Sequence, residues 1–406
     1  MKQNDRFLEE ASKLEDRTAS FLADVIERPS LPCREHQVVQ RIGEEMTELG
    51  FDEVIVDGLG SVIGRIGDGP VRLVYDSHID VVDVGDPSQW TSDPFTADVR
   101  NGIMYGRGAS DNKAAIATMV PGAALIKRLG IDASRFTLYV IGTVQEEDCD
   151  GLALEHILTE VIPRPELVVL GEATNLQVYR GHRGRAEFAI HTKGLACHAS
   201  APERGDNAIY KVAPILEEIE ALNDRLAVDP FLGKGTVVVS RIEAVTPSIN
   251  AVPDGCTVYL DRRLTIGETI GSARSELETL PAVQRESAEV ELLTYTALAY
   301  TGTEVTADKY FPTWVTPEDH PGVQAAVEAG EQALGTELPI GRWIFSTNGV
   351  ASAGKLGIPT IGFGPANEAY AHSTQDQCPI DHLVPAVAWY AAFPDRYLAA
   401  AGRASA

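Results

Sequence analysis

Short apolar runs and amphipathic stretches alternate along the first part of the chain, and the same texture returns after residue 299. The runs VRLVYDSH (71–78), FTLYVIGT (136–143) and PELVVLGE (165–172) are largely apolar, as strands buried on both faces are. The stretch 112–130 between the first two runs has the pattern of a helix that ends at a glycine. Because strands and helices take turns, this part is predicted to be an α/β domain with a mixed, mainly parallel sheet sandwiched by helices.

The pattern changes near residue 181. The stretch RGRAEFAIHTKG (183–194) alternates apolar and polar residues, which is typical of an antiparallel strand with one exposed face. Further elements are expected over 206–226 (helix), 233–245 and 254–265 (strands), 272–278 (helix) and 290–300 (strand). This pattern predicts a small α+β domain over residues 181–298, inserted into an α/β domain made of residues 1–180 and 299–406.

The N-terminal stretch carries apolar positions at helical spacing, from Phe7 and Leu8 to Val25 and Ile26, which indicates an amphipathic helix. It has no apolar segment of the kind that marks a signal peptide. A second helix is expected over residues 35–49, after two prolines interrupt the pattern.

Composition narrows the expected partners and location. The chain has 406 residues, which favours two domains, and a net charge of −25, which repels nucleic acid and anionic membranes. Its five cysteines are scattered and form no CxxC pair, as in a reduced cytoplasmic protein. No apolar stretch is long enough to span a bilayer. We therefore expect a cytoplasmic protein that acts on small molecules and binds neither nucleic acid nor membrane.

Acidic and histidine residues follow the predicted strands of the α/β part or lie in adjoining turns, where ligand sites form in open α/β sheets. They are His78, Asp80, Asp111, Glu146, Glu147, Glu172 and His372. Each alone has a simpler explanation, such as a structural histidine, a solvated turn or, for Asp111, a helix N-cap. Together they offer two histidines and three carboxylates, a ligand set for two zinc-like ions about 3.5–4 Å apart.

The same pattern indicates roles within such a centre. Asp111, on a tight glycine-rich turn, is suited to bridge both ions. Asp80 could hold the second ring nitrogen of His78 and so fix its tautomer. The adjacent Glu146 and Glu147 can aim at different targets, so one can ligate a metal while the other acts as base.

At this level of detail the sequence resembles the co-catalytic zinc peptidase/deacylase family M20, which includes acetylornithine deacetylase, succinyl-diaminopimelate desuccinylase, aminoacylase-1 and the glutamate carboxypeptidases. Within it, YRGHRGRAEF and GFGPANEAYAH are most similar to a branch of selenium-metabolism hydrolases. The matching motifs follow the family's order over nearly the whole chain: SHIDVV, WTSDPF, GRGASDNKAA, VQEED, GEAT, ACHAS, NAVPD with DRR after it, and AHST.

The resemblance implies two Zn²⁺ ions per subunit, with Co²⁺ or Mn²⁺ as alternatives. His78, Asp111 and Glu172 would bind one ion, and Asp111, Glu147 and His372 the other. Asp80 would orient His78, and Glu146 would be the general base and acid. The fold implied is zinc-peptidase-like, with a ferredoxin-like insert that serves as lid and dimerisation domain.

The resemblance also implies roles for residues of the insert. His198 would reach the active site of a second subunit in a homodimer and stabilise the oxyanion. Asn250 and Arg263 would contact substrate, with Arg263 pairing with its carboxylate. Read without the resemblance, His198 is a packed core histidine and Arg263 a surface ion pair. Arg262 competes with Arg263, since strand neighbours face opposite sides.

The implied activity is hydrolysis of the amide bond of an N-acyl amino acid by a metal-bridged hydroxide, with a glutamate as general base. A di- or tripeptidase or a carboxypeptidase of the same family is the alternative, and a non-catalytic metal- or ligand-binding protein is a remote one. Many family members carry a Gly-Gly-Thr-Asp-like loop before the last strand, where this chain has FSTNGV (345–350). That difference leaves the substrate class open.

Overall fold

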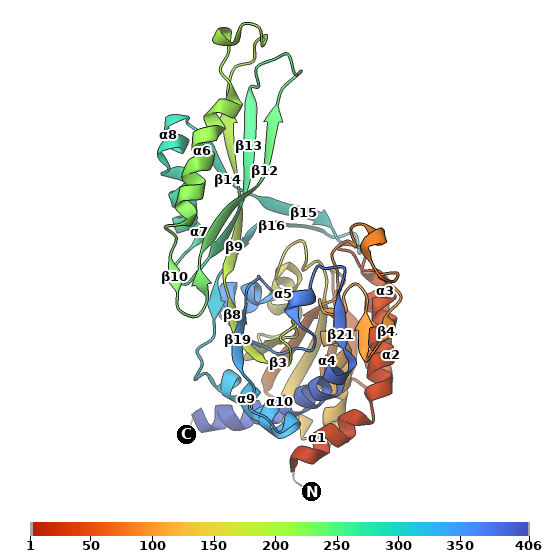
Figure 1. The fold of residues 1–406 in the computed structure, drawn as a ribbon. Coiled ribbons are helices and arrows are strands. Elements are labelled where there is room, and N and C mark those ends of the chain that lie inside the picture. Colours follow the sequence, from red (N-terminus) through yellow and green to blue (C-terminus); the bar gives the residue numbers. More distant parts are fainter. Residues whose placement is uncertain (1–2, 405–406) are drawn as a thin grey trace.

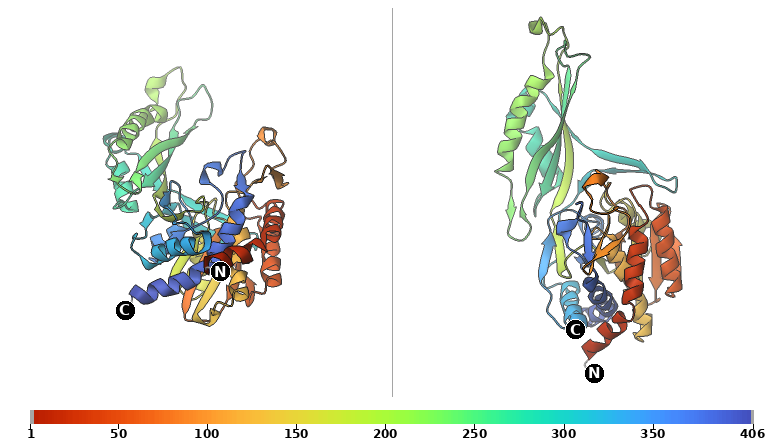
Figure 2. Two further views of the ribbon diagram at one scale, coloured as in Figure 1. Left: turned by 60° about the horizontal axis from the view of Figure 1, so that its bottom comes forward. Right: turned by 45° about the vertical axis from the view of Figure 1, so that its right-hand side comes forward.

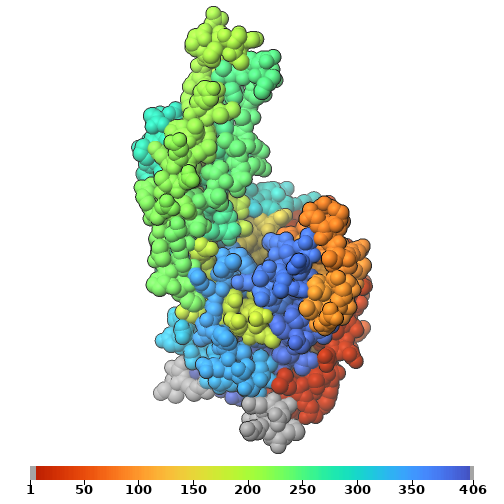
Figure 3. All heavy atoms as spheres, in the orientation of Figure 1, coloured from red at the N-terminus to blue at the C-terminus, as the bar shows by residue number. Residues whose placement is uncertain are grey.

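The computed structural model describes residues 3–404 and has two main sheets in separate parts of the molecule (Figure 1). The larger part holds both ends of the described chain. The smaller part projects from it as an elongated body (Figure 3). No helix within residues 3–404 combines the length and the apolar character needed to cross a bilayer.

The large sheet has nine strands and a parallel centre. Its order is β1-β2-β6-β3-β7-β20-β8-β18, with β19 beside β8. Its strands are β1 (Glu53–Val56), β2 (Val62–Ile66), β3 (Val71–His78), β6 (Phe136–Thr143), β7 (Leu167–Leu170), β8 (Val178–His182), β18 (Trp314–Val315), β19 (Ile340–Trp343) and β20 (Thr360–Gly362). β3 runs parallel to β6 and β7, and β7 runs parallel to β20, whereas β1, β2 and β18 pair antiparallel. The predicted mixed sheet is confirmed.

Helices cover both faces of this sheet because successive strand residues point to opposite sides. Leu73 and Tyr75 of β3 pack into the core under α1 (Gln3–Ser12), α2 (Glu15–Ile26), α3 (His36–Glu48), α4 (Lys113–Arg128), α9 (Pro321–Leu334) and α10 (Leu383–Ala404). Val74 packs into the opposite core with α5 (Leu152–His156), the wide turn Ile157–Val161 that continues it, and Val350–Lys355. The single amphipathic helix expected at the N-terminus was wrong, since a turn after Ser12 divides it into α1 and α2.

The second sheet belongs to the insert. Its strands are β9 (Gly184–Lys193), β12 (Thr236–Val245), β13 (Gly255–Leu264), β14 (Glu289–Leu292) and β17 (Tyr310–Phe311), and its helices are α6 (Ala208–Asn223), α7 (Ile270–Glu278) and α8 (Pro281–Arg285). The order β12-β13-β9-β14 is antiparallel throughout, and β17 pairs with Arg185 and Ala186 at the start of β9, next to the large part. The helices cover one face, as Figures 1 and 2 show. This is the predicted ferredoxin-like arrangement.

A two-stranded arm leaves the insert and returns to the large part (Figure 2, right). It consists of β15 (Thr294–Leu298) and β16 (Glu304–Asp308). At its tip the Tyr300 hydroxyl donates to the carbonyl oxygen of Gly60 at 2.9 Å, and Thr301 and Thr303 both donate to that of Gly58 at 2.8 Å. The arm therefore ties the insert to the loop between β1 and β2.

The chain passes from the large sheet to the insert between β8 and β9, and β17 still pairs with β9. The arm, over residues 294–308, lies between the two parts. The predicted domain limits at residues 181 and 298 stay a prediction.

Candidate metal centre

Neighbouring strands of the large sheet deliver the candidate ligands to one edge. His78 is the last residue of β3, Glu146 and Glu147 follow β6, and Glu172 follows β7. Because β6, β3 and β7 lie side by side and parallel, their carboxyl ends meet there. Asp111 reaches the same place from the turn before α4.

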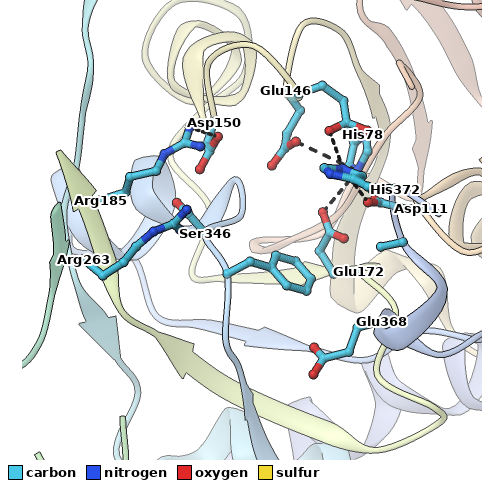
Figure 4. Close-up of a pocket in the computed structure, with 13 residues that line it drawn as sticks. His78, Asp111, Glu146, Asp150, Glu172, Arg185, Arg263, Ser346, Glu368 and His372 are labelled. Atoms are coloured by element: carbon cyan, nitrogen blue, oxygen red, sulfur yellow. Dashed lines mark hydrogen bonds and ion pairs between the residues drawn. The ribbon is translucent and has the colours of Figure 1, made fainter. Parts of the chain in front are cut away.

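His372 is brought in by a small sheet of three strands. β21 (Gln377–Pro379), which follows His372, pairs with β5 (Ile103–Tyr105), which precedes the Asp111 turn and pairs with β4 (Asp98–Arg100). This pairing holds the His372 loop against the Asp111 turn (Figure 4).

Asp111 lies at the centre of the cluster, with one carboxylate oxygen toward each histidine. Its Oδ1 is 2.8 Å from His78 Nε2, and its Oδ2 is 3.2 Å from His372 Nε2. Burial opposes ionisation of Asp111, but its bonds with both histidines hold its pKa below the ordinary value. An ionised carboxylate that offers its two oxygens to two separate nitrogen donors has the arrangement of a bridging ligand.

The remaining carboxylates complete two overlapping sets. Glu172 Oε1 is 3.4 Å from His78 Nε2, and Glu147 Oε2 is 2.9 Å from His372 Nε2. Glu146 Oε2 is 4.0 Å from His78 Nε2. One ligand atom from each of His78, Asp111 and Glu147 lies within 4.8 Å of the others, so a single ion could touch all three.

The charge of this cluster fits divalent cations. Burial raises the pKa of Glu146 and Glu172 well above the ordinary value and that of Glu147 to about 7. Burial disfavours a charged His78, yet the carboxylates of Glu146 and Glu172 raise its pKa well above the ordinary value. Crowded buried carboxylates are stabilised when positive charge is supplied among them. Imidazole with carboxylate is a donor set that zinc and similar ions accept.

Asp80 supports this cluster of candidate ligands in two ways. The His78 Nδ1–H donates to the Asp80 carbonyl oxygen at 3.1 Å, and the Asp80 carboxylate lies 3.6 Å from the same nitrogen. This leaves Nε2 as the ring nitrogen of His78 that could bind a metal ion. The carboxylate of Asp80 also accepts the backbone N–H groups of Glu146, at 3.1 Å, and Glu147, at 2.9 Å. The sequence indicated the first role and gave no sign of the second.

Two more buried carboxyl groups hold the loops from behind. Asp376 accepts from the backbone N–H groups of Gly108 and Ser110, both at 2.7 Å, and so fixes the turn before Asp111. Glu35 accepts the backbone N–H of Gln145 at 3.1 Å. Burial raises the pKa of Glu35 to about 8.

The cluster forms one wall of a cavity of about 370 Å³. The opposite, insert-side wall is made of Arg185 and Arg263 of the insert, with Asp150 and Ser346 of the large part beside them (Figure 4). Arg263 of β13 and Arg185 of β9 are direct cross-strand partners and both line the cavity. Like charges at such positions repel, but each arginine is paired with an aspartate. Arg263 Nε donates to Asp261 at 2.7 Å, and Arg185 Nη2 donates to Asp150 at 2.8 Å.

Arg262 faces the other way, as strand alternation requires. Its side chain is buried against Glu268 and Glu276 in the insert. Side chains of the FSTNGV loop also point in two directions. Phe345 and Ser346 line the cavity, while the Asn348 side chain donates to the buried carboxylate of Asp76 at 2.9 Å.

His198 and Asn250 do not line the cavity of their own chain. They lie together on the exposed far part of the insert, where the Ala199 N–H donates to the Asn250 carbonyl at 2.8 Å. His198 is exposed, so it is not a packed core histidine, and its Nδ1 accepts from the Ser200 N–H at 3.1 Å.

Four polar residues that the sequence did not single out also line the cavity: Asp150, Arg185, Ser346 and Glu368. Three had a signal. Asp150 continues the acidic run VQEEDCD, Ser346 lies in the divergent FSTNGV loop, and Glu368 precedes His372 in one short loop. Arg185 lies in the YRGHRGRAEF stretch, but nothing there indicated a place in the cavity, which depends on the register of Arg185 with Arg263.

A parallel-centred sheet with a buried histidine and carboxylate cluster and a ferredoxin-like insert defines a metal-dependent hydrolase. The chain belongs to peptidase family M20/M25/M40, whose model matches residues 74–396. The family predicted from the sequence is thereby confirmed.

Individual relatives show different degrees of likeness. The chain is 47% identical over 392 residues to the uncharacterized protein YgeY of Escherichia coli (strain K12), covering 97% of each. It is 25% identical over 276 residues to succinyl-diaminopimelate desuccinylase of Dechloromonas aromatica (strain RCB), covering 66% of this chain and 73% of that one. The Bacillus subtilis YXEP protein, described as a dinuclear metal-binding peptidase, shares the fold with a TM-score of 0.68 at 15% identity, covering 96% of this chain and 99% of that one.

Proposed function

We propose that this protein is a dinuclear zinc amidohydrolase that cleaves the amide bond of an N-acyl amino acid, with Co²⁺ or Mn²⁺ as alternative metals. The observation that carries the proposal is the central position of Asp111, which presents one oxygen to His78 and the other to His372. His78, Asp111 and Glu172 would hold one ion, and Asp111, Glu147 and His372 the other. When bound, such ions acidify water and polarise an amide carbonyl.

The other residues of the cavity have distinct tasks in this proposal. Glu146 belongs to neither ligand set, and its carboxylate lies beside the cluster, so it can take a proton from water and return it to the leaving amine. Arg263 offers its remaining N–H groups to the carboxylate of the substrate, for which a guanidinium is well shaped.

A di- or tripeptidase or a carboxypeptidase is the second candidate. The same arginine pair would bind the C-terminal carboxylate of a short peptide, and the YXEP protein is described as a peptidase. A protein that only binds metal or ligand is the remote candidate, since Asp111 is placed to serve as a bridge and Glu146 to serve as a base.

One panel of N-acetyl amino acids, N-succinyl amino acids and dipeptides, assayed with Zn²⁺ or Co²⁺, tests the activity. The variant Glu146→Ala should lose turnover by roughly 10²- to 10⁴-fold. Its metal content should stay near two ions per chain. Glu160→Gln, which changes an exposed carboxylate outside the cavity, should behave as wild type. Undiminished turnover in Glu146→Ala would refute the assigned role of Glu146.

We further propose a homodimer formed through the insert. The edge strand β12 exposes Val238, Ile242 and Val245, whose exposed fractions are 55%, 51% and 62%. An apolar edge strand of this kind is open to pairing with a second copy. His198 and Asn250, which lie far from their own cavity, would then serve the cavity of the partner.

Subunit mixing tests this arrangement. Glu146→Ala and His198→Ala homodimers should each be nearly inactive. A mixed dimer would contain one complete site if His198 acts across the interface, so mixing should restore about a quarter of wild-type activity. Lack of any recovery despite subunit exchange, monitored by native mass spectrometry, would place His198 outside the partner's site.

The net charge and the unpaired cysteines support a cytoplasmic location and small-molecule substrates. All five cysteines are unpaired, as expected in a reducing cytoplasm. The net charge of −25 favours small-molecule substrates over nucleic acid or anionic membranes. Cell fractionation with an antibody to the protein checks the location.

A further inference from the structure

Six carboxylates line the cavity, and five of them have partners or a task. Asp111, Glu147 and Glu172 belong to the ligand cluster, Glu146 lies beside it, and Asp150 accepts from Arg185. The sixth is Glu368. Within residues 3–404 the structure records no hydrogen bond or ion pair of its side chain, and its buried Oε2 has no partner. Burial alone raises its pKa to about 7, since no neighbouring cation offsets the loss of water.

The loop that carries Glu368 is held in place from several sides. Asn367 caps the short turn Glu368–Tyr370 by accepting from the Ala369 N–H at 3.0 Å. Before it, the Ala366 N–H donates to His382 Nδ1 at 3.2 Å, and the Ala366 carbonyl accepts from the Asn175 N–H at 2.7 Å. The backbone that carries Glu368 is therefore held in place, and from there the side chain reaches no hydrogen-bond partner within residues 3–404.

Glu368 lies apart from the other charged groups of the cavity. Figure 4 shows it below the ligand cluster, with Arg185 and Arg263 on the other side of the cavity. Glu368 is half-buried, so its carboxylate has lost part of its hydration without gaining a partner, which is unfavourable unless a ligand supplies one. An ammonium group, with three N–H donors and a positive charge, is the chemical complement.

We propose that Glu368 binds an ammonium group of the substrate, so that the cavity selects substrates with both a carboxylate and a positive charge. This inference rests on the proposed function and narrows its substrate class. The ammonium can belong to the acyl half, as in a dipeptide, or to the side chain of the amine half, as in an N-acyl diamino acid. Simple acyl derivatives of apolar amino acids should bind more weakly.

Binding to the zinc-loaded Glu146→Ala protein, measured by isothermal titration calorimetry, separates recognition from turnover. Two pairs of ligands differ only by replacement of the ammonium with a methyl group. Glycyl-alanine against N-propionyl-alanine tests the acyl half, and Nα-acetyl-ornithine against Nα-acetyl-norleucine tests the amine half. The ammonium ligand of at least one pair should bind roughly 10- to 100-fold more tightly than its methyl counterpart.

Adding Glu368→Gln to this protein should remove that preference and leave the binding of the methyl counterpart within about twofold. Glu368→Asp, which keeps the charge, should retain part of the preference, and Glu160→Gln should retain all of it. The inference is overturned if neither pair shows a preference, if Glu368→Gln weakens both members equally, or if no ligand binds.

Failure of the proposed function gives a different result. If protein with Glu146 intact hydrolyses no member of the substrate panel, while the Glu368-dependent preference persists in the calorimeter, the amidohydrolase assignment is wrong and the ammonium site stands. Turnover of the panel without any such preference removes the ammonium site and leaves the assignment.

Discussion

The two walls of the cavity are built in opposite ways. On the side of the large sheet, Asp111, His78 and His372 bind one another, and the loops behind them are fixed by further buried carboxylates. Across the cavity, Asp150 of the large part pairs with Arg185 of the insert, and within residues 3–404 the buried Asp150 Oδ2 and Arg185 Nε have no hydrogen-bond partner. The first wall is held by bonds among its own side chains, and the second keeps bonding capacity for a substrate.

This difference separates chemistry from selectivity. Groups that handle metal and protons need fixed positions, and strand ends of a packed sheet provide them. Groups that recognise a substrate need free donors and acceptors, and Arg185 and Arg263 of the insert provide donors opposite the metal cluster. Arg185 and Arg263 show how a recognition group keeps free donors. Each is paired with its own aspartate and still offers N–H groups to the cavity.

The largest effect should come from dismantling the sheet-side wall. Chelation of divalent metal should reduce hydrolysis to background, because the ions would no longer acidify water and polarise the amide carbonyl. The fold should survive, since the cluster lies at the edge of the sheet and outside the apolar cores. Activity assays and circular dichroism, before and after Zn²⁺ is returned, measure both. Full activity in the chelated protein would remove metal from the mechanism.

A smaller loss should follow when the ligands stay but their support changes. Asp80→Asn replaces an acceptor oxygen with a donor, so it can no longer accept from both Glu146 and Glu147 N–H groups. We expect about a 10- to 100-fold loss of metal affinity or activity, measured by zinc titration and kinetics. Asp83→Asn, an exposed change in the same segment, is the control. Equal behaviour of both variants would contradict the supporting role.

The insert-side wall should respond through substrate binding. Arg263→Lys keeps the charge and loses the forked geometry, so KM for carboxylate-bearing substrates should rise about 10-fold with little change in kcat. Amidated analogues of the same substrates should show no change. Arg241→Lys, on the exposed face of the insert, serves as the matched control. A loss that is the same for acids and amides would mean that Arg263 does not read the carboxylate.

The smallest effect concerns stability behind the sheet-side wall. The pKa of Glu35 is raised to about 8 in the folded chain, and an unfolded glutamate has a pKa near 4.5. Folded protein therefore loses stability as pH rises from about 4.5 to 8, because unfolding then releases a proton. Glu35→Gln should remove most of this loss, because the amide does not titrate. Urea unfolding at pH 5 and pH 8, with exposed Glu27→Gln as control, measures it. A parallel pH dependence in wild type and Glu35→Gln would rule it out.

The sequence predicted the sheet-side wall well and the insert-side wall poorly. His78, Glu147 and Glu172 could be located because each ends or closely follows a strand whose apolar sequence predicts burial. Parallel strands bring such residues together whatever the details of packing. Arg185 could not be located, since its neighbour Arg263 lies far along the chain and only the strand register joins them. The second role of Asp80 was equally hidden, because it depends on where two backbone N–H groups point.

The arm of β15 and β16 has a mechanical consequence. The insert is joined to the large part at the chain crossings beside β8 and again at Gly60, where the Tyr300 ring lies so close that a Cβ would be 2.2 Å away. Further contacts lie along the arm, where the Lys309 Nζ donates to the Asp148 carbonyl oxygen at 2.8 Å. The arm thus acts as a strut between the two parts, and a side chain at position 60 would collide with the Tyr300 ring and disturb the contact at its tip.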